Sequence, residues 1–132
     1  MSFPLKQRKI GGYSFGQKTW YTAHHLGVDY SATKGTALFA PFDGTIVSQT
    51  KGFQGGNTIL FKPKGQDVVM RFMHLDKFIT KGGFVQKGTW IANTGNTGAA
   101  TTGAHLHLDI SKHALNIGNF SNFLDPEKYE WK

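Results

Sequence analysis

Cysteine is absent from the 132 residues of the chain. Its absence excludes disulfide bonds, thiolate metal sites and cysteine nucleophiles, so any transition-metal site has to be built from histidine and carboxylate groups. Long apolar runs are absent too: no stretch approaches the ~18 residues of a membrane span. Residues 1–8, MSFPLKQR, are not followed by the apolar segment of a secretory signal. We therefore expect neither a membrane span nor a signal peptide, which suits a phage-encoded protein or a trimmed form of a secreted protein.

Acidic residues are scarce. The chain has 8 Asp and Glu against 15 Lys and Arg, which gives a formal net charge of +7 and a pI of about 9.7. A surface of this charge attracts polyanions, whether nucleic acid, anionic lipid or an anionic cell wall. The basic residues are scattered along the sequence without forming a run or a basic helix. Charge therefore predicts an anionic partner without choosing among the three.

A helical period of 3.6 residues is also missing, so we expect little helix. Short apolar segments instead alternate with Gly, Pro, Asn and Asp turn residues, as in an all-β meander or sandwich. Residues 41–44 and 62–65 are predicted to be hairpin connections. Residues 93–98 are predicted to be a loop near the functional site, and residues 1–24 a loop with an edge strand. No shift in composition divides the chain, so we expect one all-β domain over residues 1–132. The apolar segments are residues 36–40, 44–47, 57–61, 68–74, 89–93 and 105–110.

The strongest local signal is the sequence HLHLDI at residues 105–110. Side chains alternate between the two faces of a strand, so the three apolar residues point one way. His105, His107 and Asp109 point the other way, into one polar space. A single histidine in a strand is most often structural, but two on one face raise the expectation of a metal or acid–base site.

Two further motifs supply the same residue types. His25 and Asp29 form an HxxxD pair, which alone is equally compatible with a loop histidine and a turn-forming aspartate. His74 lies at the end of the apolar segment 68–74, where a structural histidine is also common. A catalytic zinc keeps three protein ligands and one open position. Together the motifs supply such a ligand set and leave two imidazoles for acid–base chemistry.

With these motifs in place, the chain resembles the M23 family of lysostaphin- and LytM-like peptidoglycan endopeptidases. The signature of that family is HxxxD followed far downstream by HxH. The similarity extends from about Phe15 to about Pro126 in the order of the family pattern. It includes GTALFAP at 35–41, DGTIV at 43–47, GGNT at 55–58, HL at 74–75, VQKG at 85–88, GNTG at 95–98, TG at 102–103 and LDP at 124–126.

This resemblance implies a compact antiparallel β-sheet domain with a substrate groove that ends at the metal site. It implies one Zn²⁺ per chain, held by His25, Asp29 and His107, and a catalytic pair formed by His74 and His105. A tyrosine is expected upstream of HxxxD, and Tyr21 is the candidate for a transition-state helper that contacts the oxyanion. Two histidines fall outside the pattern and are interpreted as bystanders: His24 and His113.

The resemblance also implies a mechanism and a substrate. Zinc would lower the pKa of bound water and polarise the scissile carbonyl. His105 would act as general base and His74 would stabilise the oxyanion or pass a proton to the leaving amine, although the sequence does not decide between these roles. The substrate would be peptidoglycan at the cell wall, outside the cell or in the periplasm, cut either in glycine-rich cross-bridges or in stem peptides with D-Ala and diaminopimelate. We expect a monomer whose loops 52–56 and 81–83 form groove walls.

Three alternatives remain open from the sequence. A catalytically inactive relative would normally have lost a ligand, whereas all five positions are intact here. A basic β-barrel that binds nucleic acid could use the 11 Phe for base stacking, but it would leave the histidines unexplained, so we expect no nucleic-acid partner. A zinc hydrolase that acts on something other than peptide bonds would need the same residues.

Overall fold

The computed structural model describes residues 3–131, and this part of the chain is almost entirely β-structure. Two short 3₁₀ turns, Phe120–Asn122 and Pro126–Lys128, are its only helical elements, which confirms the expectation of little helix. No helix among the described residues has the length and apolar character needed to cross a bilayer. The strands are β1 (Gly27–Ser31), β2 (Ala37–Phe39), β3 (Gly44–Gly52), β4 (Gly56–Pro63), β5 (Val68–Phe78), β6 (Gly83–Val85), β7 (Trp90–Thr94), β8 (His105–Lys112) and β9 (Phe123–Leu124).

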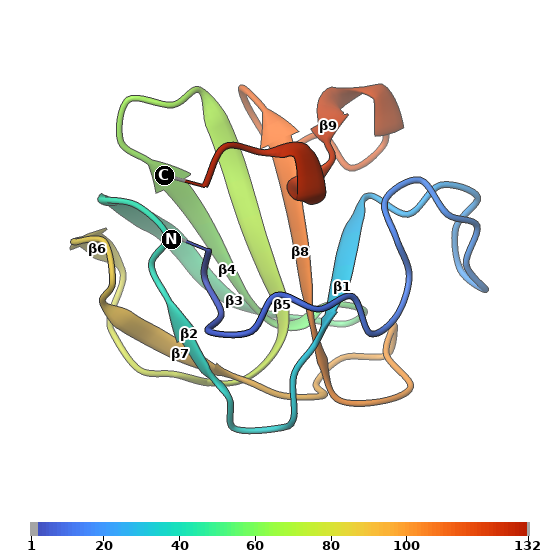
Figure 1. Ribbon diagram of the computed structural model, residues 1–132, viewed down its shortest axis with the longest axis horizontal. Helices are drawn as coiled ribbons and strands as arrows, with labels where there is room; N and C mark the ends of the chain where they lie inside the picture. Colours follow the sequence, from blue (N-terminus) through green and yellow to red (C-terminus); the bar gives the residue numbers. More distant parts are fainter. Residues whose placement is uncertain (1–2, 132) are drawn as a thin grey trace.

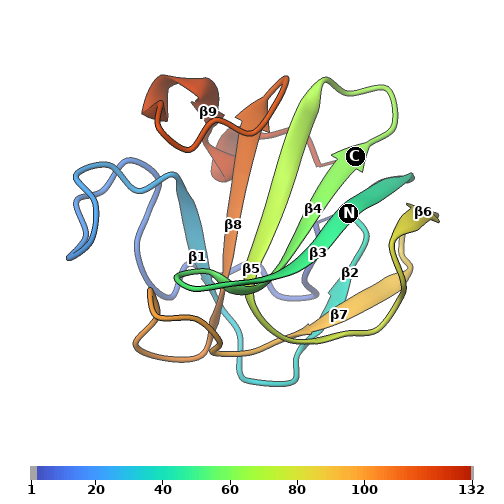
Figure 2. The ribbon, with the colours of Figure 1, turned by 180° about the vertical axis from the view of Figure 1, so that it is seen from behind.

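All nine strands join one antiparallel sheet. Strands β1, β8, β5, β4, β3 and β6 lie side by side in that order, and β7 leaves this row to pair with both β5 and β2 (Figures 1 and 2). Strand β9 pairs with β8. The predicted antiparallel β fold is confirmed, and the extent of a single domain over residues 1–132 stays a prediction.

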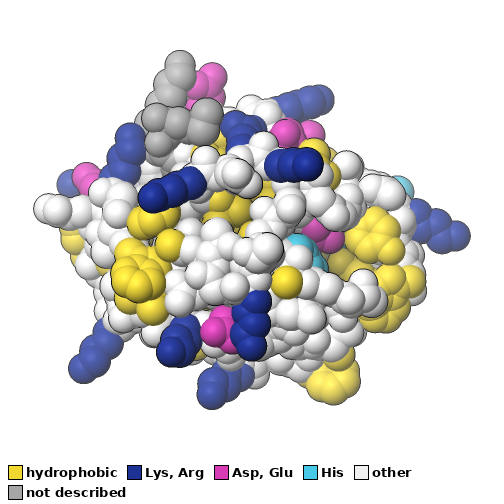
Figure 3. Space-filling view, turned by 60° about the horizontal axis from the view of Figure 1, so that its bottom comes forward, with side chains coloured by type: hydrophobic (Ala, Val, Ile, Leu, Met, Phe, Trp, Pro, Cys, Tyr) yellow, Lys and Arg dark blue, Asp and Glu magenta, His cyan; other side chains and the backbone are white. Residues whose placement is uncertain are grey.

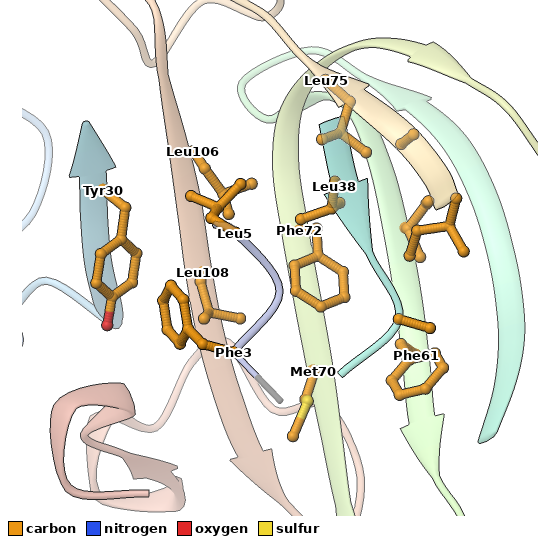
Figure 4. Packing of buried hydrophobic residues seen from close by; sticks show 14 of the residues in the cluster. Phe3, Leu5, Tyr30, Leu38, Phe61, Met70, Phe72, Leu75, Leu106 and Leu108 are labelled. Atoms are coloured by element: carbon orange, nitrogen blue, oxygen red, sulfur yellow. The ribbon is translucent and has the colours of Figure 1, made fainter. Parts of the chain in front are cut away.

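The hydrophobic core lies on one face of this sheet. The N-terminal and C-terminal segments both cross that face (Figures 1 and 2), and Phe3 and Leu5 pack near Leu106 and Leu108 (Figure 4). The apolar side chains of β8 are fully buried, as the alternation of HLHLDI predicts. Burial of each such side chain stabilises the fold by about 1.5–3 kcal/mol. The opposite face of β1 and β8 thereby carries polar side chains, among them Asp29, His107 and Asp109.

Two expectations about the strands and their connections are wrong. Residues 62–65 close the β4–β5 hairpin as predicted, but residues 41–44 are not a hairpin, because β2 pairs with β7 and not with β3. The segment 68–74 does not end at His74, since β5 continues to Phe78. Residues 9–13 lie along the edge of β1 through the bridge from Ile10 to Tyr30 and three backbone hydrogen bonds, which agrees with the expected edge strand, whereas β1 itself was not expected. In each case the partner is distant in sequence, so local patterns do not reveal it.

Candidate metal centre and catalytic cleft

Two neighbouring strands bring the predicted metal ligands together. The β1–β8 register places Asp29 opposite His107, and Asp29 Oδ1 lies 3.0 Å from His107 Nδ1. His25 precedes β1 and is held by backbone hydrogen bonds with Gly16 and Gln17. Its Nε2 lies 3.4 Å from the same carboxylate oxygen. One ligand atom from each of these three residues lies within 4.8 Å of the other two.

The ring of His25 is oriented for a metal ligand. Its Nδ1 lies 3.2 Å from the carbonyl oxygen of Ser14. Because a carbonyl only accepts hydrogen bonds, Nδ1 carries the proton and Nε2 presents a lone pair. That Nε2 atom is buried and has no hydrogen-bond partner among the described residues. A buried, unsatisfied polar atom costs about 1–3 kcal/mol, and a bound cation at this point would remove the cost.

The ring of His107 is oriented in the same way by a carboxylate. Its Nε2 lies 2.7 Å from Asp109 Oδ2, which leaves Nδ1 to face Asp29 and the ligand cluster. Asp109 is fully buried and is paired with Arg71 at 2.6 Å. A ligating histidine whose other nitrogen donates to a carboxylate is the usual arrangement around protein-bound zinc. Two imidazoles and one carboxylate therefore form a donor set that fits zinc.

The charges of this cluster shift its pKa values. Burial alone would raise the pKa of Asp29, but the imidazoles of His105, His107 and His25, each with a nitrogen within 3.5 Å of its Oδ1, outweigh burial and hold that pKa well below its usual range. Burial opposes protonation of His107, but hydrogen bonds with Asp109 and Asp29 prevail and raise its pKa to about 9. Protons and metal cations thus compete for the same nitrogen of His107.

His74 reaches the cleft through a bulge in β5. Asn57 pairs with Leu75 and Ile59 pairs with Phe72, so β5 has one residue more than β4 in this interval. His74 occupies the left-handed region with φ 64°, which is rare for a residue with a side chain. Strict alternation after Phe72 would send His74 to the core, and the bulge turns it to the polar face. Local strain of this kind is typical of functional sites.

His74 and His105 are held as a pair with matching tautomers. His74 Nδ1 lies 2.7 Å from Thr97 O, and His105 Nδ1 lies 2.7 Å from Gly103 O. Both rings therefore carry the proton on Nδ1 and leave Nε2 free to accept one. The ring centroids are 4.9 Å apart, and His105 Nε2 lies 3.5 Å from Asp29 Oδ1. Burial lowers the pKa of His74 to about 4, which keeps this imidazole neutral at pH 7.

Tyr21 lies at the edge of the cluster. Its ring centroid is 6.4 Å from that of His25, and burial together with the charge of Asp29 raises its pKa to about 12. The phenol is therefore protonated at neutral pH and available as a donor. Tyr13 was not singled out from the sequence, yet its ring lies 5.7 Å from that of His25 and its backbone N–H donates to Asp29 at 3.4 Å.

Two adjoining cavities contain the histidines of the cleft in their walls. One has a volume of about 250 Å³ and is lined by His25, His74 and His107, while the other, of about 160 Å³, reaches Asp29 and His105. Tyr21 and Ala100 line both cavities. Figure 3 shows a histidine and an acidic side chain in a hollow of the surface, with apolar side chains beside them. A peptide lying across both cavities would pass the ligand cluster.

Of the two loops expected to form groove walls, one lines a cavity and the other does not. Gln54, from the loop 52–56, lines the larger cavity. Residues 81–83 line neither cavity, because they lead into β6, which pairs with β3 at the far edge of the sheet. That part of the expectation is wrong.

The structure brings the five predicted ligand and catalytic residues into one cleft and leaves the two bystanders outside the cluster. His24 stacks on Phe120 with ring centroids 5.0 Å apart, and His113 is paired with Asp67 at the surface. Sequence reasoning gave no role to Arg71 and none to Asp109, although Asp109 falls on the predicted polar face of HLHLDI. The backbone carbonyls of Ser14, Thr97 and Gly103, which accept hydrogen bonds from the histidines, cannot be predicted from a sequence pattern, because every residue has a carbonyl.

Comparisons with known proteins identify the family of this chain. Residues 23–119 match the family model Peptidase family M23. The chain is 39% identical over 95 residues to an uncharacterized metalloprotease of Haemophilus influenzae and 34% identical over 89 residues to the peptidoglycan DD-endopeptidase ShyA of Vibrio cholerae. These matches cover 70% and 67% of this chain, but the chain spans only about a fifth of the length of either relative (20% each).

Two solved structures with the same fold match this chain over most of their own length. The catalytic domain of the antimicrobial peptidase lysostaphin from Staphylococcus simulans has a TM-score of 0.79 at 30% identity and covers 88% of this chain and 87% of its own. The structure of LytU has a TM-score of 0.77 at 31% identity, covering 92% and 83%. On the match over residues 23–119, the chain belongs to peptidase family M23.

Proposed function

We propose that this chain hydrolyses peptide bonds of bacterial peptidoglycan, using one zinc ion held by His25, Asp29 and His107. The observation that carries the proposal is the convergence of three ligand atoms within 4.8 Å, including a buried Nε2 of His25 without a hydrogen-bond partner among residues 3–131. Support for the substrate comes from family membership and from ShyA, a peptidoglycan DD-endopeptidase. The site of action would be the cell wall, outside the cell or in the periplasm.

A zinc ion bound here would supply Lewis-acid activation of water and of the scissile carbonyl. The protein's own residues supply the proton transfers. His105 and His74 both present an unprotonated Nε2 toward the cleft, so either imidazole can accept the proton of the attacking water and later return it to the leaving amine. Tyr21, protonated at neutral pH, can donate a hydrogen bond to an oxygen that develops negative charge. The division of roles between His74 and His105 stays open.

The test is digestion of purified sacculi by the zinc-loaded protein. We expect release of soluble peptide-containing fragments, loss of release after chelation, and recovery when Zn²⁺ is added back. Metal analysis should find about one zinc per chain. Sacculi left intact by protein that carries a full zinc would contradict the proposed substrate, and release that persists without metal would contradict the proposed chemistry.

A further inference from the structure

Arg71 brings a permanent positive charge to the larger cavity. It lies on β5 opposite Asp109 of β8, and its side chain is only 13% exposed. Among residues 3–131, no Asp, Glu or Lys lines this cavity beside it. Arginine stays protonated at every physiological pH and only donates hydrogen bonds. The cavity is therefore suited to a ligand group that is anionic.

One edge of the Arg71 guanidinium already forms hydrogen bonds with Asp109. Nε lies 3.1 and 3.0 Å from the two oxygens of Asp109, and Nη2 lies 2.6 Å from Oδ2. Nη1 makes no hydrogen bond with any residue in the part of the chain that the structure describes. Two N–H donors of Nη1 thus remain for a group that enters the cavity.

Arg71 lies close enough to the predicted metal ligands to contact a substrate residue next to the scissile bond. Asp109 Oδ2 accepts from both Arg71 Nη2 and His107 Nε2, so a single carboxylate oxygen separates the guanidinium from a predicted zinc ligand. A peptide whose scissile bond lies at the ligand cluster would place a neighbouring residue beside Arg71. A carboxylate on that residue would meet a charged donor in a partly dry cavity, where such hydrogen bonds are strongest.

We propose that Arg71 is a specificity-determining residue that binds a carboxylate of the substrate next to the scissile bond. The inference rests on the proposed peptidoglycan hydrolysis and narrows its substrate to stem peptides that carry a carboxylate at this place. Uncharged oligoglycine cross-bridges offer no such group. The carboxylate can come from the side chain of diaminopimelate or from a terminal D-Ala.

Matched peptide pairs test the inference without changing the protein. The first pair has the same stem peptide with diaminopimelate or with lysine, which differ by one carboxylate. The second pair has a terminal D-Ala with a free carboxylate or with a carboxamide. We expect removal of the carboxylate to lower kcat/KM about 10- to 100-fold in one pair, as for loss of a hydrogen bond to a charged group, and the affected pair identifies the source. Equal kcat/KM within both pairs overturns the inference.

Two arginine variants complete the test. Arg71→Lys keeps a positive charge beside Asp109 but loses the planar fork, so the preference for the carboxylate peptide should fall while zinc content is retained. Arg8→Lys is the matched control, because Arg8 pairs with Glu127 away from both cavities, and it should keep the full preference. An undiminished preference in Arg71→Lys overturns the inference.

Binding separates this inference from the proposed function. The same peptide pairs are titrated calorimetrically into zinc-loaded His105→Ala protein, where turnover is not needed. Tighter binding of the carboxylate member supports the role of Arg71, and equal binding within both pairs overturns it. Failure of the proposed function would appear differently, as an absence of hydrolysis of every peptide by the wild-type protein.

Discussion

At the scale of single residues, the site depends on which nitrogen of each imidazole carries the proton. Backbone carbonyls accept from Nδ1 of His25, His74 and His105, whereas Asp109 accepts from Nε2 of His107. In its neutral form, each ring therefore presents its lone pair toward the cleft. The two predicted histidine ligands and the two predicted catalytic histidines share this property, so orientation alone does not separate the two roles.

Alanine substitutions distinguish the metal ligands from the catalytic histidines. His25→Ala and Asp29→Ala should lose zinc, since each removes one of three ligand atoms. His74→Ala and His105→Ala should keep zinc and lose about 10²–10⁴-fold in the rate of peptide hydrolysis, as expected for a general acid or base. The measurements are metal content and turnover of one peptide. His24→Ala, which removes an imidazole stacked on Phe120, should change neither. Zinc loss in His105→Ala as complete as in His107→Ala would mean that ligand and base are exchanged.

The pH dependence of metal uptake follows from His107. Its pKa is raised to about 9, so at pH 7.5 the imidazole of a chelator-treated sample is protonated. Zinc needs the neutral ring, so zinc binding should release about one proton from His107, and zinc affinity should rise with pH up to about 9. Calorimetry at pH 7.5 in two buffers of different ionisation enthalpy measures the proton release directly. Zinc binding with no proton release would contradict the charge assigned to His107.

At the scale of elements, the cleft is assembled by a close contact between two loops. Gly98 has φ +91°, and a Cβ added there would lie 2.3 Å from the carbonyl oxygen of Gln54. The same loop supplies the Thr97 carbonyl that orients His74. Only glycine combines this φ with this approach. The loop 95–104 and the β3–β4 turn thus hold each other in place, and His74 depends on both.

Two glycine substitutions in the loop 95–104 test whether His74 depends on this loop contact. Gly98→Ala should destabilise the loop by about 1–3 kcal/mol, because it adds backbone strain and a clash with backbone atoms. Peptide hydrolysis should fall while the zinc ligands remain. Gly103→Ala is the control, since a Cβ at Gly103 meets no atom within 4 Å. The backbone carbonyl that accepts a hydrogen bond from His105 Nδ1 is retained in this variant. Thermal unfolding and turnover are compared for both variants. A loss in Gly103→Ala equal to that in Gly98→Ala would contradict the loop contact.

How much the sequence predicts differs from element to element. The alternation in HLHLDI predicts the faces of β8 correctly, because that strand is regular. The same rule fails at His74, since the bulge that redirects it depends on the register with β4, a contact between distant segments. The sequence VDY within β1 also alternates, with Val28 and Tyr30 buried in the core, but five residues flanked by glycine and polar residues gave too weak a pattern for a strand. Pairing of β2 with β7 is equally invisible to local patterns.

At the scale of the whole molecule, the net charge of +7 should govern how the chain meets its substrate. Attraction to an anionic wall is screened by salt, with a Debye length of about 10 Å at 0.1 M and 3 Å at 1 M. Digestion of sacculi should therefore slow as salt rises. Hydrolysis of a small stem peptide, which lacks the long-range attraction of a polyanionic wall, is the control and should change much less. An equal salt response of both substrates would contradict electrostatic recruitment to the wall.

The central claim is that the cleft cuts peptide bonds of peptidoglycan, and the bonds opened in purified sacculi test it most directly. Each peptide-bond cleavage creates one new amino group, whereas cleavage of the glycan strand creates a new reducing end. After digestion by the zinc-loaded protein, labelling of the fragments and mass spectrometry should find new amino groups only, and none with His25→Ala. New reducing ends, or the same amino groups released by His25→Ala, would contradict the account.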